Sequence, residues 1–113
     1  MLILDAPTKS IEIDLAGAVA TSQLQWTIHA VDSLDKDQSV ADILSADGVT
    51  ASTTNVTMMV GPPLGQTRQV KCLTVHNADT TGATITILLN NNGSLRTLWK
   101  GTILTLENLE YDD

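Results

Sequence analysis

The segment QTRQVKCLTVHNADTTGATITILLN, residues 66–90, decides the fold that we predict for this chain. Within it, Thr67 to His76 and Ala83 to Leu89 are rich in β-branched and apolar residues, and both have the length of a strand. The polar connection between them, Asn77 to Gly82, contains glycine and is typical of a turn. We therefore predict a β-hairpin at the centre of an all-β domain.

The first strand of this segment does not alternate cleanly. Val70 and Cys72 lie on one face of a regular strand, and Leu73 and Val75 lie on the other. A strand that is apolar on both faces is normally covered on both faces. We therefore expect the opposing sheet to cover one face of this strand, and a loop or a second subunit to cover the other.

Other stretches of β-rich sequence surround this segment. Residues 9–15 alternate strictly, with Ile11, Ile13 and Leu15 on one face. The remaining candidate strands are residues 23–31, 50–60, 94–100 and 102–107. The sequence Asn90 to Gly93 indicates a tight turn, because Asn and Gly tolerate positive φ. About seven or eight strands without a convincing long helix predict an antiparallel, jelly-roll-like β-sandwich.

The chain of 113 residues has the size of a single domain, residues 1–113. We expect residues 1–8 to form an N-terminal arm and residues 32–48 to form an irregular, mostly exposed loop. Two alternatives remain open for residues 32–48. The spacing of Val40, Ile43 and Leu44 would suit one or two helical turns, and the same residues could form an edge strand whose neighbouring charges discourage sheet pairing.

Aromatic residues are scarce, because Phe is absent and the only others are two Trp and one Tyr. The core must therefore consist of Ile, Leu, Val, Met and Ala, with the indoles as large fillers. The predicted core anchors are Trp26, Ile28, Ile85, Ile87 and Trp99. As an alternative, Trp26, Trp99 and Tyr111 could form an exposed platform on which a sugar stacks.

The formal net charge is -7, from 13 acidic and 6 basic residues. Nucleic-acid binding relies on neutralising phosphates with Lys and Arg, so direct binding to DNA or RNA is not expected. The sequence begins without the basic lead and apolar segment of a signal peptide, and no run approaches the about 20 apolar residues of a membrane span. We expect synthesis in a cytoplasm and no membrane partner.

No catalytic or metal-binding constellation stands out. The residues with the most versatile chemistry are His29, His76 and Cys72, and their spacing matches neither a catalytic triad nor a structural zinc site. The group Asp32, Asp35 and Asp37 lacks the glycine and distal glutamate of a calcium loop and is better explained as a solvated acidic loop. We therefore predict a protein that is not an enzyme and needs no cofactor or metal.

Four of the six basic residues fall in the second half of the chain, on elements that we expect to be neighbours in one sheet. They are Arg68, Lys71, Arg96 and Lys100. They can be explained as scattered solubilising charges. They can also be explained as a patch that contacts an acidic protein surface, which makes them the candidate partner-binding residues.

From Gly61 to Tyr111 the chain resembles a family of small virion proteins of tailed bacteriophages. The resemblance lies in the Arg68-Gln69-Val70-Lys71 strand, the Asn77-Ala78-Asp79 turn, the Asn92-Gly93 turn and the terminal Leu109-Glu110-Tyr111. Members that decorate capsids are jelly-roll-like cement or staple proteins of short-tailed phages.

This resemblance implies a structural protein on the capsid surface that bridges neighbouring subunits of the major capsid protein. It also implies a homo-oligomer, for which a dimer across a local two-fold axis is the simplest form. Two other roles remain open: a structural component of the tail or neck, and a carbohydrate- or receptor-binding module of the tail.

Overall fold

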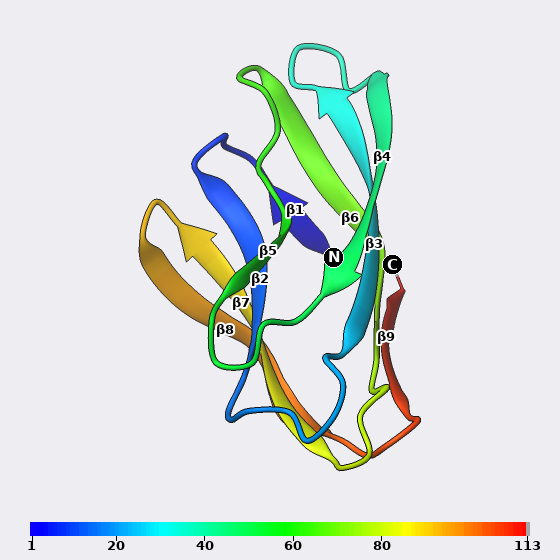
Figure 1. Cartoon of the computed structure of the whole chain (residues 1–113). Helices are drawn as coiled ribbons and strands as arrows, with labels where there is room; N and C mark the ends of the chain where they lie inside the picture. The colour runs from blue at the N-terminus through cyan, green and yellow to red at the C-terminus, as the bar shows by residue number, and fades with distance from the viewer. Residues whose placement is uncertain (113) are drawn as a thin grey trace.

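The computed structural model describes residues 1–112, which form nine β-strands and no helix (Figure 1). The strands are β1 (Leu2–Leu4), β2 (Lys9–Leu15), β3 (Gln25–Leu34), β4 (Val40–Val49), β5 (Val56–Met59), β6 (Gln66–His76), β7 (Ala83–Asn91), β8 (Ser94–Ile103) and β9 (Asn108–Asp112). They form two antiparallel sheets that enclose one apolar core. The predicted all-β, antiparallel sandwich is therefore confirmed. None of the described residues forms a helix long and apolar enough to cross a membrane.

The first sheet has the strand order β1-β6-β3-β4, and β9 also pairs with β6. β1 pairs with residues 68–70 of β6 and β9 pairs with residues 72–76, so two short strands share the edge of β6 that faces away from β3. The Leu2 N–H joins these two strands by donating to the Tyr111 hydroxyl at 3.0 Å. The second sheet has the order β5-β2-β7-β8, so β8 is one of its edges.

The core forms where the alternation predicts it. Trp26, Ile28, Ile85 and Ile87 are all buried, with Trp26 on β3 exposed by only 5%. The Trp26 ring lies directly against β4, because a Cβ atom added to Gly48 would be 2.6 Å from the ring. The fifth predicted anchor is wrong, since Trp99 on the edge strand β8 is 37% exposed. An edge strand has no neighbour on its outer side to complete the enclosure of so large a side chain.

The prediction of a central hairpin is wrong, although the predicted strand bounds are close. β6 and β7 belong to different sheets, so residues 77–82 cross from one sheet to the other instead of turning back. The hairpin that forms is β7–β8. Its turn is the predicted one, with φ of 51° at Asn92 and 95° at Gly93, the positive values that a tight two-residue turn requires.

β6 is not apolar on two faces. The pairing with β3 places Cys72 opposite His29 and Val70 opposite Ala30, so Lys71 is an extra residue in β6. Such a β-bulge shifts the alternation by one position. Val70 and Leu73 therefore both face the core, and Lys71 is exposed. The second covering partner that we expected for this strand is not needed.

The expected loop at residues 32–48 is largely regular structure. β3 continues to Leu34 and β4 runs from Val40 to Val49, paired with β3 along its length. The edge-strand alternative was the correct one. The turn between them contains Gln38 with φ 61°. β4 is an exposed edge strand, and such a strand does not need a continuous apolar face. Its charged residues therefore hide the alternation by which a strand is recognised in a sequence.

The N-terminal arm is partly ordered as a strand. Within residues 1–8, β1 pairs with β6 and Leu4 is only 1% exposed. Because Leu4 belongs to the core cluster, the arm is an integral part of the sandwich.

Candidate functional site

The four predicted partner-binding residues do not form one patch. Arg68 and Lys71 lie on β6 in the first sheet, whereas Arg96 and Lys100 lie on β8 in the second. Lys71, Arg96 and Lys100 are exposed, but Arg68 is 4% exposed. The prediction that these strands are neighbours in one sheet is wrong, and Arg68 is too enclosed to contact a partner.

Arg68 instead organises one end of the sandwich. Its guanidinium donates to both carboxylate oxygens of Asp32, with Nε–Oδ1 at 2.7 Å and Nη2–Oδ2 at 2.8 Å. Asp32 is directly opposite Arg68 in the β3–β6 ladder and is 1% exposed. Nη1 donates to the carbonyl oxygens of Val60 at 2.7 Å and Gly61 at 3.3 Å. We call Arg68, Asp32, Val60 and Gly61 the Arg68 cluster. It attaches the β5–β6 connection to the first sheet.

Asp79 organises the other end of the sandwich, as Arg68 does the first. It lies in the β6–β7 connection, which crosses between the sheets. Its carboxylate accepts hydrogen bonds from the backbone N–H groups of Ala20 and Thr21 at 2.8 Å, and of Ser22 at 3.2 Å. Thr80 N–H donates at 2.8 Å. These donors, apart from Thr80, lie in the β2–β3 connection about 58 residues earlier in the chain. The backbone N–H groups, that of Ala20 most strongly, hold the pKa of Asp79 well below its usual range, against the opposing effect of burial.

Asn77 extends this arrangement to the third loop at the same end. Its side-chain amide donates to the carbonyl oxygens of Thr81 and Ile103, both at 2.9 Å, and it is fully buried. Its backbone N–H donates to Glu107 O at 3.0 Å. We call Asp79, Asn77 and residues 20–22 the Asp79 cluster. It joins the three connections that gather at the lower end of the molecule in Figure 1.

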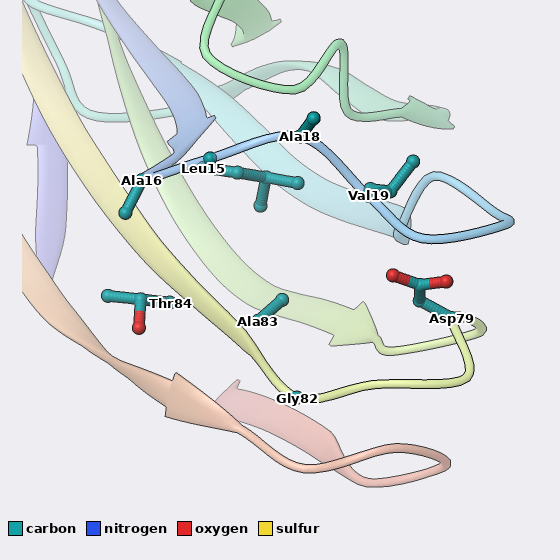
Figure 2. Close-up of a pocket in the computed structure, with 9 residues that line it drawn as sticks. Leu15, Ala16, Ala18, Val19, Asp79, Gly82, Ala83 and Thr84 are labelled. Carbon is teal, nitrogen blue, oxygen red and sulfur yellow. The ribbon is translucent and has the colours of Figure 1, made fainter.

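A hollow of about 340 Å³ lies beside the Asp79 cluster. Its lining comes from the end of β2, the β2–β3 connection, the β6–β7 connection and the start of β7. The lining residues are Leu15, Ala16, Gly17, Ala18, Val19, Asp79, Gly82, Ala83 and Thr84. Figure 2 shows Asp79 turned toward the loop that carries Ala18 and Val19. Both carboxylate oxygens already accept backbone hydrogen bonds. The carboxylate therefore has a structural role here.

A second hollow, of about 320 Å³, opens between the edges of the two sheets. We call it the seam, and its lining residues are Leu2, Leu73, Ile87, Leu98, Trp99, Leu109, Glu110 and Tyr111. Leu73 and Ile87 belong to the core, so the seam is a place where the core opens to the surface between β8 and β9. Leu98 is the extra residue of a bulge in β8, since Ile87 pairs with Trp99 and Leu88 pairs with Thr97. Leu98 and Trp99 remain 38% and 37% exposed.

The two long edge strands carry opposite charges. β4 contains Asp42 and Asp47 and no basic residue, whereas β8 contains Arg96 and Lys100 and no acidic residue. Both strands are ten residues long. Within residues 1–112, each pairs with a strand on one side only. The difference in charge between these edges was missed from the sequence, because residues 32–48 were not identified as a strand.

The histidines and the cysteine are not brought together. His29 is exposed on β3, and Nδ1 of His76 lies 2.5 Å from the side-chain oxygen of Asn108. In the acidic segment, Asp35 accepts from the Thr67 hydroxyl at 2.6 Å and Asp37 accepts from the Ser39 backbone at 3.0 Å. Residues 1–112 contain no group of three His, Cys, Asp or Glu side chains placed to hold a metal ion.

The Asp79 cluster is the main feature that sequence reasoning missed. The only signal in the sequence was Asn77-Ala78-Asp79 ahead of Thr80-Thr81-Gly82, which fits an exposed turn equally well. In comparison with known proteins, no protein-family model, curated protein or solved structure matches the chain.

Proposed function

We propose that this protein is a structural component of a phage virion that decorates the capsid and cements it by bridging neighbouring major capsid protein subunits. The observation that carries the proposal is the position of the exposed cations in a protein of net charge -7. Lys71 is exposed on the first sheet and Lys100 on the second. A bridging protein needs two contact surfaces, and this arrangement supplies a cation on each sheet.

The surroundings of Lys100 are consistent with a contact site. Lys100 pairs with Thr86 on β7, and Thr86 pairs with Asp14 on β2, so the three share the outer face of the second sheet. Desolvation raises the pKa of Asp14, and the charge of Lys100 partly offsets this increase. An acidic capsid surface docked here would contact Lys100, which lies on the outer face of the second sheet in the row of Thr86 and Asp14.

The cementing effect would come from repetition. A single contact of modest area binds weakly, but a molecule that touches two subunits at once makes the second contact intramolecular. Copies repeated over a symmetric shell together raise the free energy needed to separate capsomers. We propose that the working form is a homo-oligomer, which multiplies the contacts per particle in the same way.

The proposal is tested by mixing purified protein with capsids that lack it, and measuring co-sedimentation and the temperature at which the particles release DNA. We expect saturable binding that weakens with salt, and a higher release temperature. Lys100→Glu should weaken binding at least tenfold, because it replaces attraction by repulsion. The matched control is Lys36→Glu, which makes the same charge change in the exposed β3–β4 turn and should bind as the original protein does.

Two results would contradict capsid decoration. If the protein forms rings and joins tails or necks but ignores capsids, it is a tail or neck component. If it ignores capsids and instead binds host polysaccharide with a change in Trp99 fluorescence, it is a carbohydrate-binding module. The specific observation behind the second possibility is that Trp99 and Tyr111 line the same seam.

A further inference from the structure

We propose that copies of this protein assemble head to tail, with the β4 edge of one copy adding to the β8 edge of the next. The occupant of the seam and of the β8 edge is then a second copy of this chain. This inference goes beyond the capsid proposal and does not depend on it, since it concerns the purified protein alone.

The first argument is the exposure of the two edges. A strand of ten residues at a sheet edge offers unpaired N–H and C=O groups to another chain. On β4 the side chain of Ile43 is 75% exposed and that of Val49 is 53% exposed. On β8, Leu95, Leu98 and Trp99 are 47%, 38% and 37% exposed. Both edges therefore carry apolar side chains that pairing with another strand would bury.

The second argument is charge, which selects among the possible pairings. A two-fold pairing of β8 with β8 brings Arg96 and Lys100 of one copy near those of the other, and a β4–β4 pairing brings Asp42 and Asp47 together. Like charges across strands are destabilising and opposite charges are stabilising. The same charges that oppose each two-fold pairing favour β4 on β8, so they act as a specificity device.

The third argument is which face of each strand carries these groups. Asp47 pairs with Thr27, and Ile43 pairs with Val31, so both lie on the outer face of β4, away from the core side that carries Ala46 opposite Ile28. On β8, Arg96 pairs with Leu89 and Trp99 pairs with Ile87, which places Arg96 and Trp99 on the face that lines the seam.

Consider a second copy whose β4 pairs with β8 and whose outer β4 face is turned to the seam. This arrangement buries exposed apolar side chains and also pairs opposite charges. It brings the exposed apolar side chains of that β4 face to the face that carries Trp99, and it brings Asp47 to the face that carries Arg96. The neighbouring copies then lie on opposite sides of the joined sheet, so their sandwiches do not occupy the same space. Because the two contact surfaces differ, the contact is heterologous, and it builds a closed ring or an open chain rather than a two-fold dimer.

The test uses the full chain and two exposed substitutions, Ile43→Asp on β4 and Arg96→Glu on β8. Sedimentation velocity should show concentration-dependent assembly of the original protein. Each variant alone should raise the apparent dissociation constant at least tenfold. Arg96→Glu sets a like charge against Asp47, and Ile43→Asp places a carboxylate among the apolar side chains that the contact buries. Circular dichroism checks that both variants are folded.

Mixing the two variants distinguishes the geometry. The Ile43→Asp copy retains an intact β8 edge and the Arg96→Glu copy retains an intact β4 edge, so an equimolar mixture should form a heterodimer and nothing larger. The reciprocal charge exchange, Asp47→Arg with Arg96→Glu in one chain, should restore assembly. The proposal is overturned if the original protein stays monomeric at high micromolar concentration. It is equally overturned if either variant alone assembles normally, or if the mixture forms no heterodimer.

Discussion

At each end of β6 a buried charged side chain holds a long connection in place, but the two ends use different chemistry. At its start, the Arg68 cluster pairs a cation with a carboxylate and two backbone carbonyls. Just beyond its end, the Asp79 cluster surrounds a carboxylate with backbone N–H groups and no cation. Both clusters attach a long connection to a strand that runs the length of the sandwich (Figure 1).

The difference follows from where the partner groups come from. Asp32 and Arg68 face each other across a regular ladder, so their backbones are already paired and their side chains can meet. Residues 20–22 lie outside the named strands, and the Asp79 carboxylate accepts their N–H groups. A side chain is then the simplest acceptor for N–H groups that no neighbouring strand pairs. The Arg68 cluster therefore attaches a connection to a sheet. The Asp79 cluster instead provides the acceptor for backbone N–H groups within a connection.

The largest effect should come from breaking the Arg68 cluster on one side. Arg68→Met leaves the Asp32 carboxylate buried without its cation and frees the Val60 carbonyl, so we expect a loss of about 3–5 kcal/mol in the free energy of unfolding by urea. The double variant Asp32→Leu/Arg68→Met should lose less, since no uncompensated charge remains. Arg96→Met, in dilute protein, is the matched exposed control. A loss for Arg68→Met no greater than that of the control would show that the ion pair does not hold this end together.

The Asp79 cluster should reveal itself through pH. Folding lowers the pKa of Asp79, so its ionised carboxylate stabilises the folded state. This stabilisation is complete above the ordinary pKa of 3.8 and is lost as the pH falls toward the lower pKa of the folded state. Asp79→Asn, which cannot carry the charge, should lower Tm by about 5–10 °C at neutral pH. The difference in Tm between the two proteins should stay constant down to about pH 5 and shrink below pH 3.8.

Comparing the two proteins at each pH removes the contribution of the other carboxylates, because these titrate in both. A difference in Tm that grows on acidification would have the wrong sign for a carboxylate stabilised by N–H donors. It would mean that folding raises the pKa of Asp79 instead of lowering it.

The parts of the fold that could be predicted are those that local alternation determines. In β2, and in β3 as far as Ala30, every second residue is apolar, and Ile11, Ile13, Trp26 and Ile28 are buried as that pattern requires. The Asn92-Gly93 turn could be predicted because only a few residue types accept positive φ at low cost. Each of these features depends on residues within a few positions of one another.

The parts that could not be predicted depend on distant partners. A single extra residue, Lys71, shifted the alternation of β6 and imitated a strand with two apolar faces. Arg68 looked like a surface cation because its partner, Asp32, lies 36 residues away. The seam and the opposite charges of β4 and β8 follow from the order of strands in the sheets, which the alternation within a strand does not encode.

The smallest expected change in Tm comes from a substitution that removes a side-chain donor of the Asp79 cluster and keeps the backbone donors. Thr21 donates to Asp79 twice, through its N–H at 2.8 Å and its hydroxyl at 3.0 Å. Thr21→Val removes only the hydroxyl and leaves the backbone donor in place, so Tm should fall by about 2–4 °C. In an Asp79→Ala background the same substitution should change Tm by much less, because the acceptor is gone. Equal losses in both backgrounds would place the role of the Thr21 hydroxyl elsewhere, whereas a vanishing loss would confirm that the cluster depends mainly on its backbone N–H groups.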